Sequence, residues 1–281
     1  RILSAQGTIA ANHYGGVVTE DRISLPPGGC LLNLSGNTVE LSGGIEASKA
    51  LIRLEARTID LGYRSKLTDC HLILAPRLPA GAIQFPDLSE IRMQRVRIDL
   101  DLGAHEISEG GASVCRAVAG LLRTLPADQG ETAARLLRQL EAFMYPVGQG
   151  ARGGAVEYSA VLLLAKLRFN DLPLDETVQR RFEQRKGVAG LLPEAIRSFS
   201  DDYKALLEIA RGLASAGHIE EAAHNTTIMS TLQSLTGDAG GPLYASAKDL
   251  RDRLRAHIKD DHPNAVAVFR RQEDLHSEPA W

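Results

Sequence analysis

Four acidic side chains in the first third of the chain have the types and spacing of a catalytic carboxylate set. Glu40 and Asp60 hold the same position in two similar lines of twenty residues, and Asp99 and Asp101 follow in the alternating segment RVRIDLDLG. Outward side chains on stacked strands lie about 5 Å apart, close to the carboxylate separation of retaining glycosidases. The sequence therefore offers candidate catalytic residues for a carbohydrate-active hydrolase or lyase on a β-helix face: Glu40, Asp60, Asp99 and Asp101.

Two observations count against that chemistry. Ladders of charged residues are common on the outward faces of β-helices whether or not they are catalytic, and a fold alone assigns no function. Aromatic side chains that would stack on sugars are also scarce, because Tyr14, Tyr63 and Phe85 are the only Tyr and Phe residues in this part of the sequence. We therefore keep the carbohydrate-active enzyme as the alternative hypothesis.

Two further patterns suggest cofactor or metal chemistry, but neither has the required context. The segment GQGARGG has the Gly-x-Gly-x-x-Gly spacing of a dinucleotide site, yet helical patterns flank it where a strand should precede it. Within this expected interhelix loop, Arg152 is the side chain that a phosphate would meet. Glu220 and His224 share one helix face, which indicates a surface ion pair, because two ligands do not make a metal site. We predict no cofactor and no metal.

The elements that position these residues begin with a repeat. The lines LLNLSGNTVELSGGIEASKA (31–50) and LIRLEARTIDLGYRSKLTDC (51–70) match at nearly every apolar position, and HLILAPRLPAGAIQFPDLSE (71–90) continues the pattern less closely. Within each line the apolar residues recur at every second position, which is the periodicity of a β-strand. Short strands that repeat at a fixed period of about twenty residues are typical of a solenoid.

We therefore predict a right-handed parallel β-helix over residues 1–104, with coils of about 20 residues. One coil cannot bury its inward side chains alone, so coils stack and share an apolar column. The decisive expectation is that Leu34, Leu54 and Leu74 lie in one stack. A small antiparallel sandwich is the rival fold, because it also has short alternating strands.

The stacking also predicts the state of the cysteines. Cys30 and Cys70 fall in one column two coils apart, which puts their Cα atoms about 9.6 Å apart, beyond disulfide reach. Together with Cys115 they are expected to be reduced and buried, since three cysteines make no disulfide framework and have no metal-site spacing.

The pattern becomes helical near residue 105. We predict an α-helical domain over residues 105–270 and a C-terminal tail over residues 271–281, which gives a segregated α+β chain. Ala112 should begin the first helix, Asp128 should cap the second and Ser200 a later one. Residues 155–169 are apolar nearly all round and predict a buried central helix. Residues 218–237 are read as one helix that pairs with the helix before it.

Composition limits the function. The net charge of −3 and the pI near 6.3 argue against a general nucleic-acid binder, and no apolar run is long enough to span a membrane. The chain opens at Arg1 instead of Met, which suggests that residues have been removed ahead of it, so no targeting signal can be read. The excess of Arg over Lys suggests a GC-rich bacterial genome.

The first hypothesis for function is a non-enzymatic protein-interaction module that presents the solenoid face and helical grooves to a protein partner. By analogy with bacterial secreted or injected effectors and with scaffold proteins, which often join a solenoid to helical modules, we expect such a setting. A polysaccharide is the expected ligand only under the enzymatic alternative.

Overall fold

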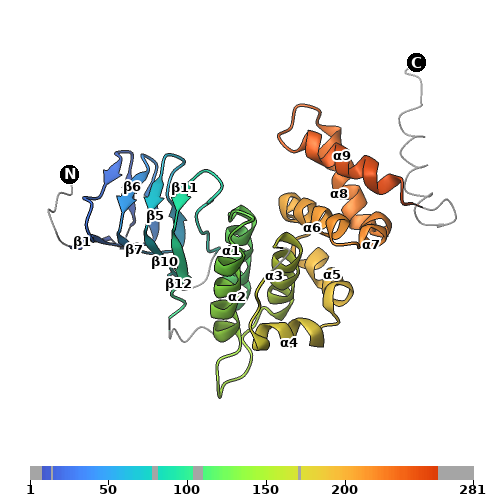
Figure 1. The fold of residues 1–281 in the computed structure, drawn as a ribbon, viewed down its shortest axis with the longest axis horizontal. Coiled ribbons are helices and arrows are strands. Elements are labelled where there is room, and N and C mark those ends of the chain that lie inside the picture. The colour runs from blue at the N-terminus through green and yellow to red at the C-terminus, as the bar shows by residue number, and fades with distance from the viewer. Residues whose placement is uncertain (1–7, 14, 78–81, 104–109, 170–171, 259–281) are drawn as a thin grey trace. The chain divides into compact units, whose positions relative to one another are not determined.

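The structure is a computed structural model that describes residues 8–13, 15–77, 82–103, 110–169 and 172–258. The N-terminal part is a parallel β-solenoid of about three turns, and helices follow it along the chain (Figure 1). This confirms the segregated α+β layout. Every strand pair is parallel, which excludes the antiparallel sandwich for this part of the chain.

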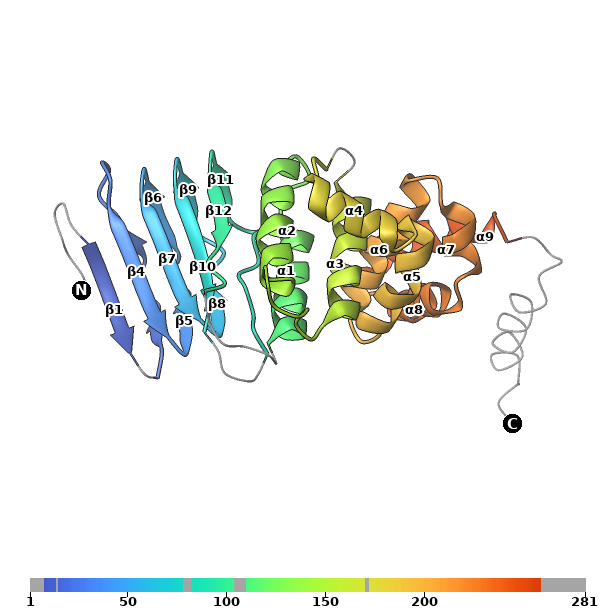
Figure 2. The same ribbon diagram turned by 90° about the horizontal axis from the view of Figure 1, so that it is seen from below.

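Successive turns of the solenoid contribute strands to three sheets. The five-stranded sheet has the order β1-β4-β7-β10-β12, formed by Thr8–His13, Leu31–Gly36, Leu51–Ala56, His71–Pro76 and Arg97–Leu100. The four-stranded sheet has the order β11-β9-β6-β3, formed by Arg92–Gln94, Lys66–Thr68, Ile45–Ser48 and Ile23–Ser24. The three-stranded sheet has the order β2-β5-β8, formed by Val17–Thr19, Thr38–Leu41 and Thr58–Asp60. Figure 2 shows β1, β4, β7 and β10 of successive turns side by side.

The strand register confirms the predicted apolar column. Leu54 pairs with Leu34 on one side and with Leu74 on the other, and all three side chains have no exposed surface. Leu74 in turn pairs with Leu100, so the column continues to the last strand of the sheet. Every second residue of a strand points inward and stacks on the equivalent residue of the next turn. The buried columns formed in this way hold the turns together.

The repeat length of twenty residues holds only for the central turns. Leu31 pairs with Leu51 and Leu51 with His71, so each of these steps is twenty residues long. The first step, from Thr8 to Leu31, takes 23 residues, and the last, from His71 to Arg97, takes 26. The extra residues are accommodated outside the paired strands, which is why the third line of the repeat looks degenerate in the sequence.

One corner of the solenoid repeats a strained backbone conformation. Lys49, Asp69 and Arg95 hold equivalent places before the strands of the five-stranded sheet, and their φ angles are 55°, 54° and 52°. Residues other than glycine adopt this left-handed region only where a turn requires it. At another corner Gly62 has φ 69°, and a Cβ atom there would lie 2.4 Å from the carbonyl oxygen of Leu41. A side chain at Gly62 would therefore push two turns apart.

The cysteines behave as the register predicts. The carbonyl groups of Cys30, Ala50 and Cys70 accept hydrogen bonds from the first residues of the next strands, so these residues hold the same position in successive turns. Cys30, Cys70 and Cys115 are all buried, and none of the three forms a disulfide. Burial raises the pKa of the Cys115 thiol well above its usual value, and the charge of Glu157 raises it further.

The chain divides into two compact units, Arg1–Ala195 and Ile196–Trp281. In its described residues, the first unit contains the solenoid, four complete helices and most of a fifth. These helices are α1 (Gly111–Thr124), α2 (Gly130–Met144), α3 (Ala155–Arg168), α4 (Glu176–Gln184) and α5 (Gly187–Ser198). The second contains α6 to α9, which are Tyr203–Ser215, Ile219–His224, Thr226–Gly237 and Tyr244–Arg255. The boundary predicted at residue 104 lies inside the first unit, and the predicted tail 271–281 lies outside the described residues. No helix in the described ranges is long and apolar enough to cross a membrane.

The helical predictions were right in kind and wrong in several details. Helix α3 is buried along most of its length, as its composition predicts. The cap of α2 is Gln129 instead of Asp128, and Asp202 instead of Ser200 caps α6 by accepting from the Ala205 N–H. Helix α5 was not predicted, because Gly187, Gly190 and Pro193 are residues that ordinarily interrupt a helix.

The segment 218–237, predicted as one helix, is two helices. The helix is interrupted at Asn225, which has extended φ and ψ angles of −82° and 110°. The Asn225 side chain accepts a hydrogen bond from the Ile228 N–H at 3.1 Å and so caps α8. Asn is among the strongest N-cap residues, because its short side chain satisfies an unpaired N–H of the first turn. The capping signal was thus present inside a stretch whose apolar pattern is continuous.

Candidate functional site

The structure brings two of the four candidate acids together. Glu40 and Asp60 are register partners on β5 and β8, so they are neighbours on adjacent turns of the three-stranded sheet. Each carboxylate also holds its own turn: Glu40 accepts from the Ser42 hydroxyl at 2.9 Å, and Asp60 accepts from the Gly62 N–H at 2.8 Å. These bonds explain both acids as local turn-stabilising residues, without requiring catalysis.

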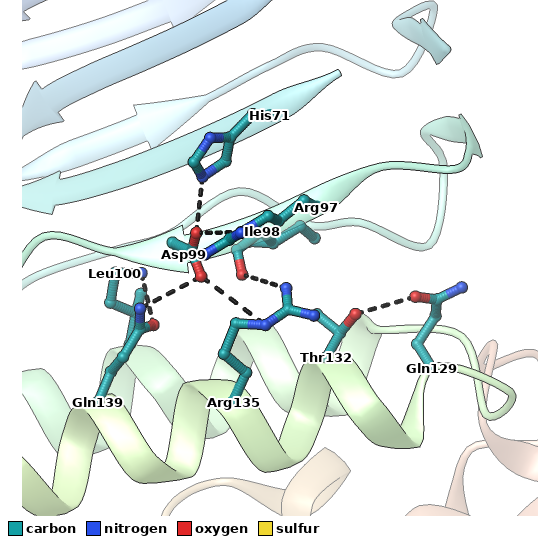
Figure 3. A network of polar contacts seen from close by, with 9 residues as sticks. All are labelled: His71, Arg97, Ile98, Asp99, Leu100, Gln129, Thr132, Arg135 and Gln139. Carbon is teal, nitrogen blue, oxygen red and sulfur yellow. Dashed lines mark hydrogen bonds and ion pairs between the residues drawn. The ribbon is translucent and has the colours of Figure 1, made fainter. Parts of the chain in front are cut away.

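Asp99 belongs to a different sheet and lies in a closed polar network (Figure 3). It is 7% exposed, and its Oδ2 lies 2.6 Å from both Nε2 of His71 and Nε of Arg97. The Gln139 amide donates to its other oxygen at 3.2 Å, with Nε of Arg135 3.9 Å away. Burial raises the pKa of Asp99, but hydrogen bonds from Arg97 and His71 outweigh it, and the pKa lies below its usual value. Such a carboxylate is held ionised and has little capacity to donate a proton.

The same network closes the last strand of the solenoid. β12 is the edge of the five-stranded sheet, and edge strands carry unpaired N–H and C=O groups. Gln139 of α2 accepts from the Leu100 N–H at 2.8 Å, and Arg135, one turn earlier, donates to the Ile98 carbonyl at 3.5 Å. Figure 3 shows both side chains rising from α2 toward the strand. Helix α2 therefore covers the edge, and Asp99 anchors the side chains that do so.

Asp101, the fourth candidate acid, forms part of a chain of ion pairs. It accepts from the Arg53 guanidinium at 2.9 Å, and the same guanidinium donates to Glu55 at 2.6 Å. The two carboxylates raise the pKa of Arg53, with the Glu55 hydrogen bond as the largest cause. Glu40 and Asp60 thus lie on the three-stranded sheet, whereas Asp99 lies on the five-stranded sheet and Asp101 directly follows its last strand. They do not line one common site.

A buried carboxylate that the sequence analysis did not single out joins three helices. Glu141 of α2 is 5% exposed, accepts from the Tyr158 hydroxyl of α3, and pairs with Arg181 of α4 at 3.0 Å. The Arg181 guanidinium lies 3.7 Å from the centre of the Tyr145 ring. Burial raises the pKa of Tyr158 far above its usual value, and Glu141 adds to the effect. Since all of its charges are compensated, this cluster holds the helices together and offers no open site.

The glycine-rich loop and the Glu220–His224 pair also serve structure. Residues 148–154 connect α2 to α3, so no strand precedes the motif, and the backbone and side chain of Arg152 both bond carbonyl groups at the end of α2. The loop packs tightly, because a Cβ atom on Gly154 would lie 2.5 Å from the backbone nitrogen of Ala112. Nδ1 of His224 lies 2.8 Å from the backbone oxygen of Glu220. Within the described residues, no group of His, Cys, Asp or Glu could hold a metal ion.

One pocket in the described part of the chain lies at the four-stranded sheet and is lined mainly by cations. It is an open pocket of about 350 Å³. Four of its six lining residues are cations, and the full lining is Arg22, Tyr63, Arg64, Ser65, Lys66 and Arg92. We call this set the basic pocket. All four cations are exposed, and the Tyr63 side chain is 57% exposed.

The register explains why these cations gather. Lys66 of β9 and Arg92 of β11 are direct partners, and on the other side Lys66 pairs with Glu46 of β6. Adjacent parallel strands lie about 4.8 Å apart, so the three side chains form one outward column. Arg22 pairs with Glu46 at 2.9 Å. In the described part of the chain, Arg64, Lys66 and Arg92 form no ion pair with an acid.

The basic pocket was missed in the sequence for a definable reason. In lines of twenty residues Lys66 falls below Glu46, but Pro86 would follow it in the next line. The last turn takes 26 residues, and this extra length brings Arg92 next to Lys66 instead. The column Glu46–Lys66–Arg92 can be recognised only when the length of that turn is known.

Comparisons with known proteins give no relative for this chain: no family model, curated protein or solved structure matches it.

Proposed function

We propose that the chain is a non-enzymatic protein-interaction module and that its partner places an acidic segment on the basic pocket. The observation that carries this proposal is the group of three cations, Arg64, Lys66 and Arg92, which line one pocket and pair with no acid among the described residues. Clustered charges of one sign repel each other and concentrate ions of the opposite sign in the cleft they line. An anionic partner relieves that repulsion.

The negative net charge of the chain makes the local group of cations stronger evidence for an anionic partner. The chain carries a net charge of −3, so a concentration of cations on one sheet is not part of a generally basic surface. Complementary charge of this kind gives specificity and speeds association more than it adds affinity. For the same reason we propose no general nucleic-acid binding, which favours basic stripes that extend along the molecule.

The proposed setting is a bacterial secreted effector or scaffold protein, and it rests on analogy. Solenoids expose long lateral surfaces suited to protein contacts, and the Arg-rich composition is typical of GC-rich bacterial genomes. We retain the right-handed winding of the solenoid in this proposal, because parallel crossovers are right-handed in nearly all proteins.

A direct test measures binding of a glutamate-rich peptide to the full chain by isothermal titration calorimetry at low and raised salt. Binding should weaken as salt rises, because exposed charges are screened. The triple variant Arg64→Gln, Lys66→Gln and Arg92→Gln should lose it. Arg57→Gln, which removes a half-exposed cation from the turn between β7 and β8, is the matched control. Binding that survives the triple variant would contradict the assignment to this pocket.

The alternative function is a carbohydrate-active hydrolase or lyase, and one observation favours it. Glu40 and Asp60 are register partners, and neighbouring strands about 4.8 Å apart put two carboxylates near the separation of a retaining pair. A polysaccharide-cleavage screen with the unmodified chain and with Asp60→Asn tests it. Cleavage that disappears in Asp60→Asn would establish the enzyme in place of the interaction module.

A further inference from the structure

The three unpaired cations of the basic pocket come from a rigid part of the solenoid. Ser65, between Arg64 and Lys66, has no exposed surface. Its hydroxyl donates to the Leu61 carbonyl and accepts from the Ile45 N–H at 2.9 Å, which ties the segment to the turn before it. Its carbonyl accepts from the Arg92 N–H at 3.0 Å, which ties it to the turn after. One buried serine therefore fixes the backbone at all three cations.

Arg64 is also oriented before any ligand arrives. Its guanidinium carbon lies 5.0 Å from the centre of the neighbouring Tyr63 ring, within the range of a cation–π contact. An Arg side chain has many rotamers, and restricting them in advance lowers the entropy lost on binding.

We propose that Arg64, Lys66 and Arg92 form a binding site for a phosphate monoester group. This inference rests on the proposed function and specifies the chemistry of the acidic partner. Two guanidinium groups and one ammonium group present thirteen N–H donors in total, five from each Arg and three from Lys. A phosphate monoester brings about −1.5 to −2 charges and three acceptor oxygens, whereas a carboxylate brings one charge and two oxygens. The phosphate matches three cations more closely.

The surroundings restrict the site to a compact anion. Glu46 stands next to Lys66 in the outward column and is occupied by Arg22, so an extended polyanion would meet a carboxylate one strand away from the pocket. Arginine clusters of this kind recognise phosphorylated segments in many proteins, and planar guanidinium groups bind phosphate oxygens in pairs. A phosphorylated side chain fits this confined set of donors better than a nucleic-acid backbone.

The experiment is an NMR titration of the isotope-labelled full chain with three short peptides that differ at one position, which carries phosphoserine, glutamate or serine. The phosphoserine peptide should bind at least about tenfold more tightly than the glutamate peptide, with shifts at the amides of Lys66 and Arg92. Each of Arg64→Gln and Arg92→Gln should weaken that binding by about tenfold, as expected for one charge-assisted hydrogen bond. Arg57→Gln, the control, should leave it unchanged.

A pH series gives an independent readout. The second pKa of a phosphate monoester is about 6, so the affinity for the phosphoserine peptide should fall as the pH drops through 6, while that for the glutamate peptide changes little. The charged or titratable groups that line the pocket are its four cations and Tyr63, Glu46 is the register partner of Lys66, and no histidine lines the pocket in the described residues. The change therefore arises from the ligand.

The outcomes separate this inference from the function on which it rests. Equal affinity for the phosphoserine and glutamate peptides would overturn the phosphate site and leave the acidic-partner function standing. Failure of both peptides to bind would overturn both. Inorganic phosphate serves as a further probe: binding as tight as that of the phosphoserine peptide assigns the site to small phosphorylated ligands, and weaker binding assigns it to a phosphorylated protein. Tighter binding of RNA or of vesicles containing anionic lipid would overturn the proposal.

Discussion

Replacing Leu54 by alanine tests the apolar column on which the solenoid depends. The Leu54 side chain has no exposed surface and stands between Leu34 and Leu74 on the two neighbouring strands. Leu→Ala substitutions in protein cores cost about 2–5 kcal/mol, and the cost rises where the surroundings cannot collapse into the cavity. Hydrogen-bonded strands on both sides hold this site open. We therefore expect a loss of about 3–4 kcal/mol, above the lower end of that range.

The expected change in melting temperature follows from the size of the unit. The first compact unit spans Arg1–Ala195, and for domains of about 150–250 residues each kcal/mol shifts the melting temperature by about 2–4 °C. Leu54→Ala should therefore lower the melting temperature by about 6–16 °C. Leu51→Ala is the matched control: it lies on the same strand, faces outward and is 37% exposed. It should cost less than about 1 kcal/mol, as surface substitutions usually do.

The assay combines thermal unfolding followed by circular dichroism with hydrogen exchange measured by mass spectrometry. Exchange should accelerate in β4, β7 and β10 of Leu54→Ala, and much less in the control. Leu54→Asp, which places an unpaired charge in the same column, should destabilise the whole solenoid. Equal shifts for Leu54→Ala and Leu51→Ala, or an unchanged melting curve for Leu54→Asp, would refute the shared column.

Three further predictions concern the solenoid edge and the buried ionisable groups. Gln139→Ala removes the partner of the Leu100 N–H group on the edge strand and should lower the free energy of unfolding by about 1–3 kcal/mol. The control Arg138→Ala, on the same helix, loses an exposed ion pair worth at most about 1 kcal/mol. Urea midpoints compare the two variants, and equal losses would contradict the role of Gln139 in capping the edge strand. Since the folded pKa of Asp99 is lowered, its contribution to stability is present above its unfolded pKa of about 3.9 and is lost as the pH falls through the lower folded value. Urea midpoints of Asp99→Asn should therefore fall less steeply below about pH 5 than those of the unmodified chain, and parallel curves would contradict this. Iodoacetamide should label none of the three buried cysteines in the native chain and all three after unfolding, as mass spectrometry would show.

The central turns of the solenoid could be predicted because their pattern is local and repeated. Leu34 and Leu54 stand at equivalent places in consecutive lines, and that spacing predicted the parallel stacking that the strand register shows. The outer turns depart from the repeat because residues can be added between strands without disturbing the paired positions. Arg92 pairs with Lys66 across such a lengthened turn, and this pairing was not predicted from a period of twenty residues, so the basic pocket was not found.

The polar network at Asp99 depends on contacts that no local pattern encodes. Gln139 and Asp99 are forty residues apart and meet only because α2 lies along β12. The sequence analysis grouped Asp99 with Glu40 as candidate acids, because the sequence does not show to which sheet of a solenoid an outward acid belongs. Their assignment to different sheets depends on where each turn bends, and those corners carry little sequence signal beyond residues such as Gly62.

The edge cap also bears on where a partner can bind. A solenoid has two kinds of surface: the edges at its ends, where backbone groups are unpaired, and the lateral faces formed by outward side chains. At β12 the edge is already used, because α2 supplies partners for Ile98 and Leu100 and fixes them through Asp99. Binding near this end must therefore use a lateral face. Of the described lateral charges, those on the five-stranded sheet near Asp99 and Asp101 are neutralised by arginines, whereas Lys66 and Arg92 on the four-stranded sheet are not. Lys66 and Arg92 are therefore the charges near this end that remain for the acidic partner proposed above.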